Sequence, residues 1–112
     1  MAFQKITPIR LAQAASTTAF LAIYTCPTGT RTYIKDITVC NTTGSAVTLF
    51  LSVVPDQGTA GTTNALFNAS SIAANTTFQW KGTQIMNAAE TLQFKGSATG
   101  LTINISGAEA VD

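Results

Sequence analysis

The sequence predicts an all-β protein, namely a single-domain antiparallel β-sandwich, jelly-roll-like, with about eight short strands. Short segments alternate apolar and polar residues, as at residues 101–106, where Leu101, Ile103 and Ile105 are separated by polar residues. Clusters of Gly, Thr, Asn and Pro divide these segments at nearly regular intervals. Helical patterning is confined to LAQAAS at residues 11–16, which is too short to stand alone. Two packed sheets would bury both apolar faces.

The expected strands follow in chain order. The first eleven residues alternate weakly around Pro8, which only an edge strand or an extended arm tolerates. We therefore divide the chain into an N-terminal arm or edge strand at residues 1–16 and a β-sandwich domain at residues 17–112. Strands are expected within the domain at residues 18–25, 32–41, 47–54, 66–71, 76–81, 83–86, 92–95 and 101–106.

Short turn sequences predict three hairpins. The turn at residues 27–29 should pair strand 18–25 with strand 32–41, and NTTGS at residues 41–45 should join 33–40 to 47–54. GSATG at residues 96–100 should join 92–95 to 101–106. In the central strand, strict alternation places Ile34 and Cys40 on one face and Ile37 on the other.

Charge is scarce and evenly spread. Charged residues make up 10% of the chain, with six Lys or Arg, five Asp or Glu and a net charge of +1. Nucleic-acid binding is not expected, because the basic residues are scattered rather than clustered. The longest apolar run, at residues 19–24, is too short to span a membrane, and charges interrupt any N-terminal signal sequence. A near-neutral Thr-rich surface is poorly protected against association, so we expect a protein partner.

The types of residue present argue against a catalytic or metal site. The chain has no histidine and two cysteines, Cys26 and Cys40, so neither a metal site nor a cofactor is expected. If Cys26 lies at a turn, Cys40 is about 26 Å away along a strand at ~3.3 Å per residue, which excludes a disulfide. No two of the five carboxylates form a recognisable motif. We expect free structural thiols, no enzyme activity and no small-molecule substrate.

Two segments are candidates for protein contacts. The N-terminal segment could lie along a neighbouring subunit by strand addition, with its apolar side chains as anchors. The loop at residues 55–64, PDQGTAGTTN, is the longest break between strands and nearly chargeless. The predicted contact residues are Phe3, Lys5, Ile6, Ile9, Arg10, Asp56, Gln57, Thr59 and Thr62. Trp80 could serve as a sugar platform, but its position in an apolar strand is more typical of a core residue.

The chain resembles small virion proteins of tailed bacteriophages in segments that together span most of its length. These segments are residues 11–14 (LAQA), 23–25 (IYT) with Pro27 and Gly29, 33–42 (YIKDITVCNT), 72–76 (IAANT), 89–93 (AETLQ) and 101–107 (LTINISG). As a stand-alone β-sandwich, it is similar to the capsid decoration, or cement, proteins. Their pattern is a strand-and-turn consensus without a catalytic signature.

This resemblance implies a structural role. A decoration protein would bind the outer surface of the capsid and stabilise capsomer junctions, with the major capsid protein and its own copies, as a homotrimer, for partners. It would be made in the host cytoplasm and reside on the capsid surface of the virion. The alternative is a tail-fibre or baseplate module that binds a host-surface receptor or glycan, which predicts Trp or Tyr side chains at the loop tips. A cellular adhesion domain would require a signal peptide, which we do not expect here.

Overall fold

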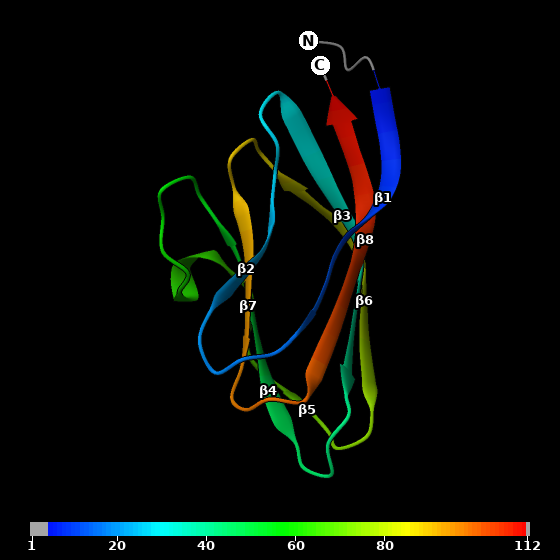
Figure 1. The fold of residues 1–112 in the computed structure, drawn as a ribbon, viewed down its shortest axis with the longest axis vertical. Helices are drawn as coiled ribbons and strands as arrows, with labels where there is room; N and C mark the ends of the chain where they lie inside the picture. Colours follow the sequence, from blue (N-terminus) through cyan, green and yellow to red (C-terminus); the bar gives the residue numbers. More distant parts are fainter. Residues whose placement is uncertain (1–4, 112) are drawn as a thin grey trace.

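The computed structural model describes residues 5–111, which form eight strands and one short 3₁₀ turn (Figure 1). No helix in this part of the chain has the length and apolar character needed to cross a membrane. The elements are β1 (Lys5–Ala15), β2 (Leu21–Thr25), β3 (Thr30–Asn41), β4 (Val47–Val54), η1 (Thr62–Asn64), β5 (Ala65–Ile72), β6 (Thr77–Met86), β7 (Thr91–Gly96) and β8 (Leu101–Val111).

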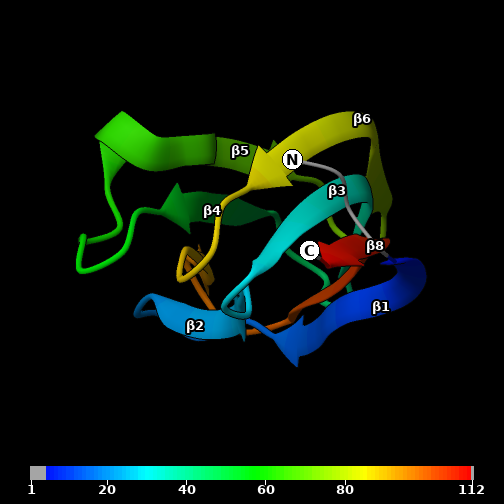
Figure 2. The same ribbon diagram turned by 90° about the horizontal axis from the view of Figure 1, so that it is seen from above.

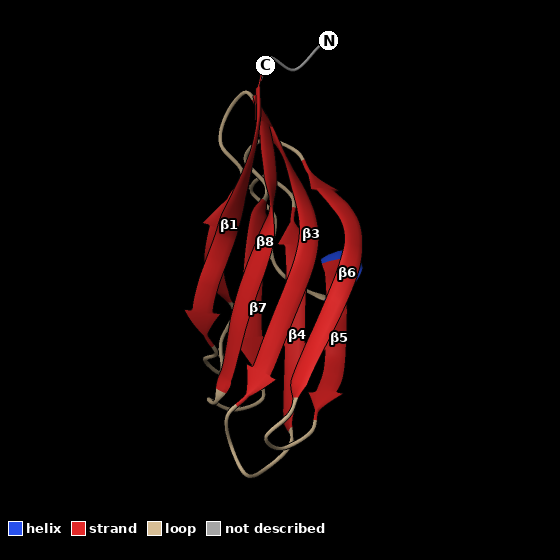
Figure 3. Ribbon diagram, turned by 90° about the vertical axis from the view of Figure 1, so that its right-hand side faces the viewer, coloured by secondary structure: helices blue, strands red, loops and turns tan. Residues whose placement is uncertain are grey.

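The strands form two four-stranded antiparallel sheets packed face to face. Sheet A has the order β1-β8-β3-β6 and lies in front in Figure 3, and sheet B has the order β2-β7-β4-β5. Seen from above, the strands of sheet B lie on the left and those of sheet A on the right (Figure 2). Every connection except β4–β5 crosses between the sheets, which is the connectivity of a jelly roll. The expected all-β antiparallel sandwich of about eight strands is confirmed.

The expected strands are present, with three main changes in extent. The strand expected at residues 18–25 begins only at Leu21, residues 76–81 and 83–86 form one strand, β6, and the last strand continues to Val111. The N-terminal segment, including the LAQAAS stretch with helical propensity, forms β1 at the edge of sheet A, where it pairs with β8. Pro8 is accommodated there because an edge strand has one side free of ladder hydrogen bonds.

The three expected hairpins are wrong. Each short turn joins strands of opposite sheets, namely β2 to β3, β3 to β4 and β7 to β8. The strands that pair with β3 are β6 and β8, while β2 pairs with β7. A turn of four or five residues is long enough to span the ~10 Å between packed sheets, so a chain reversal does not by itself make two strands neighbours. The longest connection, between β4 and β5, is the one that joins neighbouring strands.

Two bulges decide which residues face the core. The register of β3 shifts just after Ile34 relative to both neighbours, so Ile34 and Ile37 are both buried. Cys40 therefore faces outward and is half-buried, contrary to the face expected from strict alternation. A similar shift in β1 leaves Leu11 and Ala12 both buried. An extra residue changes the phase of the alternation, which is why the period-2 pattern fails at these points.

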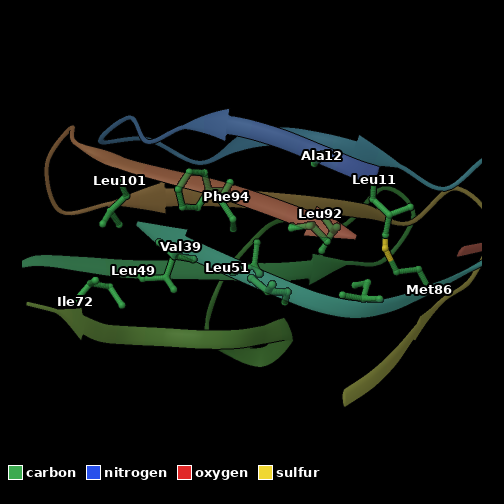
Figure 4. Close-up of a cluster of buried hydrophobic side chains, with 14 of the residues drawn as sticks. Leu11, Ala12, Val39, Leu49, Leu51, Ile72, Met86, Leu92, Phe94 and Leu101 are labelled. Carbon is green, nitrogen blue, oxygen red and sulfur yellow. The ribbon is translucent and has the colours of Figure 1, made fainter. Parts of the chain in front are cut away.

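The core lies between the two sheets and is built from the inward side chains of all eight strands (Figure 4). Phe94 is fully buried, and Trp80 packs against the cluster from the edge strand β6. Both cysteines are free, as expected. The labelled members of the cluster are Leu11, Ala12, Val39, Leu49, Leu51, Ile72, Met86, Leu92, Phe94 and Leu101.

Candidate contact surface

The outer face of sheet A presents its side chains in rows that cross all four strands. Alternate residues of each strand point outward, so successive rows lie about 7 Å apart. The strand registers define four complete rows, taken in the order β1, β8, β3, β6: Pro8, Ala108, Tyr33 and Ile85; Arg10, Ser106, Asp36 and Lys81; Gln13, Asn104, Thr38 and Gln79; Ala15, Thr102, Cys40 and Thr77. We call this face the contact surface.

The first of these rows is apolar, and we call it the apolar row. Ile85, on the edge strand β6, is 54% exposed. At the opposite edge, Ile6 is 58% exposed and pairs with Ala110 in the next position toward the end of the sheet. Apolar side chains thus follow one another across the sheet in this row, with Pro8 and Ile85 exposed at its two edges and Tyr33 and Ala108 partly exposed between them. An exposed apolar patch is a candidate interaction site.

The remaining rows are polar, and their charge is concentrated in the second row, which holds Arg10, Asp36 and Lys81. Two more exposed cations, Arg31 and Lys35, lie on β3. Asp36 is the one carboxylate among the four rows, and it accepts hydrogen bonds from Gln79 Nε2 at 3.2 Å and Thr38 Oγ1 at 3.3 Å. Arg10 and Lys81 are the cations, and the third row contains only amides and a hydroxyl. Uncharged polar groups cost much less to bury than charges when a partner supplies hydrogen bonds. The apolar row and the uncharged polar rows are therefore the parts of this surface that cost least to bury.

The predicted N-terminal contact residues fall on two faces of β1. Ile6 and Arg10 are exposed on the contact surface, and Lys5 is exposed at the start of the strand. Ile9 points inward and packs against the core. Phe3 lies outside the described residues.

The predicted loop residues lie elsewhere in the molecule. Figures 1 and 2 show the β4–β5 loop on the sheet B side, away from sheet A. Asn64 fixes the fold of this loop, because its Oδ1 accepts from the Gly61 backbone N–H at 3.1 Å and its Nδ2 donates to the Thr59 carbonyl at 3.0 Å. The structure thus does not bring the loop and β1 together. The exposed loop residues predicted as contacts are Asp56, Gln57, Thr59 and Thr62.

Sequence reasoning missed most of the apolar row. Tyr33, Ala108 and Ile85 come from three separate strands and become neighbours only through the sheet register. One signal was available in the sequence. Phe78 and Trp80 fall in the same phase of the strand alternation, whereas Ile85, after Gly82, falls in the opposite phase, as expected for an outward-facing residue that follows a bulge.

The tryptophan and both tyrosines lie on strands rather than at loop tips. Trp80 and Tyr24 pack against the core, and Tyr33 belongs to the apolar row. The aromatic loop cluster that a glycan-binding tail module predicts is therefore not formed by these three residues.

A buried polar cluster near one end of the sandwich is the closest approach to reactive chemistry among the described residues. The Tyr24 hydroxyl donates to Glu109 Oε2 at 2.5 Å and lies 2.6 Å from Thr32 Oγ1, which donates to Cys26 Sγ at 3.2 Å. Burial raises the pKa of the Cys26 thiol, so it is protonated and a poor nucleophile at neutral pH. No group of three potential metal ligands occurs in residues 5–111. The hydrogen bonds of this cluster join β2, β3 and β8.

This cluster predicts a loss of stability at high pH. Burial, followed by the hydrogen bond to Glu109, raises the pKa of Tyr24 above its ordinary value of 10.0. Because the folded state then holds its proton more tightly than the unfolded state, the stabilisation is complete below pH 10 and falls as pH rises past it. Urea unfolding at pH 7, 9, 10 and 11 should show a steeper decline for the native chain than for Tyr24→Phe. Parallel declines would contradict the assignment.

The jelly-roll architecture is shared by several classes of protein. Jelly-roll sandwiches occur in viral capsid proteins, lectin domains and cupins, so the architecture alone does not specify a function. No family model and no curated protein matches the sequence.

Solved structures of a virus share the fold. The chain is similar to a chain in the structure of infectious bursal disease virus, Gx strain, with a TM-score of 0.56 and 12% identity over 96% of this chain and 32% of that one. A chain in the structure of the Gt strain of the same virus matches with a TM-score of 0.54 and 7% identity, over 98% of this chain and 33% of that one. The chain thus spans about a third of the length of these relatives. At such low identity the likeness establishes the fold alone.

Proposed function

We propose that this chain is a non-enzymatic structural protein of a bacteriophage virion, a decoration protein that binds the outer surface of the capsid and stabilises capsomer junctions. The observation that carries the proposal is the contact surface, a four-stranded face in which an apolar row lies beside a charged row and two uncharged polar rows. The shared fold with chains in a virus structure supports a place in a virus particle. A clamp acts through buried area rather than through a catalytic pocket.

The size of the contact surface favours binding as an oligomer. Four strands about 4.8 Å apart and five rows about 7 Å apart, counting the incomplete row of Ile6 and Ala110, cover at most about 670 Å². A stable complex buries about 800 Å² on each partner, so one copy of this surface would bind only weakly. A homotrimer would present three such surfaces, and simultaneous contacts would raise the overall affinity without new chemistry. The β4–β5 loop, on the opposite side, could then touch a neighbouring capsomer.

Substitution in the apolar row should abolish capsid binding selectively. Capsids of the encoding virus that lack this protein are mixed with purified chain, and the bound fraction is measured by co-sedimentation. Ile85→Lys places a charge in the buried interface and should weaken binding at least tenfold, or about 1.4 kcal/mol. The matched control is Leu21→Lys, since Leu21 is 47% exposed on β2, an edge strand of sheet B. An edge strand tolerates lysine, so both variants should fold.

The two variants separate the possible failures. If the native chain does not sediment with capsids, the decoration function is wrong. If both variants bind equally well, the function stands and sheet A is not the contact surface. Decorated capsids should also resist heat better than bare ones, and the Ile85→Lys variant should remove that protection.

A further inference from the structure

A hollow of about 240 Å³ opens on the outer face of sheet B, opposite the contact surface. Its floor comes from β4, β5 and β7, and the η1 end of the β4–β5 loop forms one wall. The lining combines aromatic and small apolar residues with a single cation and no carboxylate: Phe20, Phe50, Ser52, Gly61, Thr62, Ala65, Phe67, Asn68 and Lys95. Few polar groups converging in an apolar hollow are typical of a ligand site.

Lys95 provides an ammonium group that is held in place but not neutralised. Its Nζ lies 5.0 Å from the centre of the Phe20 ring and 4.7 Å from that of Phe50. The two rings orient the half-buried side chain through cation–π attraction without supplying a negative charge. An anion entering the hollow would therefore meet a positioned cation, and would gain a charge-assisted hydrogen bond.

Three further polar side chains in the lining have unused hydrogen-bonding capacity. Ser52, Thr62 and Asn68 make no side-chain hydrogen bond within residues 5–111. Ser52 is only 1% exposed, so Thr62 and Asn68, which are both exposed, are the polar side chains within reach of a ligand. These groups offer donors and acceptors for the hydroxyls of a ligand.

The apolar wall is rigid and matches a small ring in size. Phe67 is fixed by an edge-to-face contact with Phe78, with ring centres 5.4 Å apart. Asn64 holds the loop that closes the hollow through its two hydrogen bonds to the loop backbone. The volume corresponds to about eight water molecules at ~30 Å³ each, which is room for one substituted ring.

We infer that the hollow binds an acidic monosaccharide unit, with its carboxylate on Lys95, its hydroxyls on Thr62 and Asn68, and its ring against Phe67. The charge of Lys95 selects an anion, and the two exposed uncharged polar side chains select a ligand that carries hydroxyls. Because the hollow and the contact surface lie on opposite sheets, this inference and the proposed function can fail independently.

The inference is tested by NMR titration of the whole chain with sodium glucuronate, glucose and sodium benzoate. Glucuronate should shift the amide signals of residues that line the hollow, with an affinity at least tenfold above that for glucose. Lys95→Met keeps the apolar stem between the two rings and should weaken glucuronate binding at least tenfold. Lys81→Met, on the contact surface, is the matched control and should leave it unchanged.

A second variant separates a sugar site from a general carboxylate site. Asn68→Ala, at an exposed position on β5, should weaken glucuronate and leave benzoate unaffected. No glucuronate-dependent shift at the hollow, or benzoate binding more tightly than glucuronate, would overturn the inference. Equal binding of glucuronate by the native chain and Lys95→Met would overturn it as well.

Discussion

The Gly107→Ala variant is expected to lose about 3 kcal/mol or more of its free energy of unfolding, at or beyond the upper end of the usual cost of overpacking. Gly107 lies in β8 opposite the bulge of β3, and a Cβ added there would overlap the carbonyl oxygen of Tyr33. The obstacle is backbone of the adjacent strand, which cannot rotate away as a side chain would. The bulge and the glycine therefore depend on each other.

The measurement is the urea midpoint, with the m value checked for a change in unfolded or native compactness. The free energy of unfolding of a domain of this size is about 5–15 kcal/mol, so the variant should be measurably destabilised at 37 °C. Gly44→Ala is the control, because a Cβ at Gly44 meets nothing within 4 Å and its backbone is not left-handed. A Gly107→Ala midpoint equal to that of Gly44→Ala would contradict the close approach of β3 and β8.

The Asn41→Ala substitution is expected to lower the free energy of unfolding by about 3 kcal/mol. Asn41 ends β3 and is 1% exposed, and its Nδ2 donates to the carbonyls of Ser45 and Ile72, both at 2.9 Å. Its Oδ1 accepts from Thr43 N–H at 2.9 Å and Thr43 Oγ1 at 2.8 Å. The amide thus has its full complement of four hydrogen bonds, and it joins the crossing from β3 to β4 to the end of β5. Removing the amide leaves the buried Ile72 carbonyl without this donor, at about 1–3 kcal/mol, and the loss of the three part-buried hydrogen bonds adds to that cost.

Two further variants test this prediction. Asn87→Ala changes an exposed residue whose side chain makes no hydrogen bond in the described chain, and should stay within about 0.5 kcal/mol of the native protein. Asn41→Asp keeps the acceptors but aims a carboxylate oxygen at two carbonyls, so it should also be destabilised at pH 7. Thermal unfolding followed by circular dichroism measures all three, and an Asn41→Ala melting curve matching that of Asn87→Ala would refute the bridging role.

The strands were predictable because alternation is a local property. Residues 47–54 were expected as a strand and form β4 as Val47–Val54, since β-branched and aromatic residues there have no competing helical pattern. The pairing of those strands was not predictable from the turns. NTTGS at the end of β3 resembles a hairpin turn. In the structure the Asn41 side chain donates hydrogen bonds to Ser45 and Ile72, and the chain crosses to the other sheet.

The contact surface was predictable only in part. Ile6 and Arg10 were expected from their place in an N-terminal strand, and both lie on the outer face of sheet A. Tyr33 and Ile85 were not expected, because their proximity depends on the register of β3 with β6, which includes a bulge. The hollow on sheet B likewise forms only when the β4–β5 loop folds against Phe50 of β4 and Lys95 of β7. The sequence alone did not predict that these two strands are neighbours.

An all-β sandwich with few charges and free thiols could be predicted from the amino-acid order, because alternation, composition and residue inventory do not depend on which strands pair. Only the folded chain shows that the strands cross between sheets as a jelly roll, and which side chains share each outer face. Pairing depends on contacts between distant segments, and a single bulge, such as the one beside Gly107, moves every later side chain of its strand to the other face.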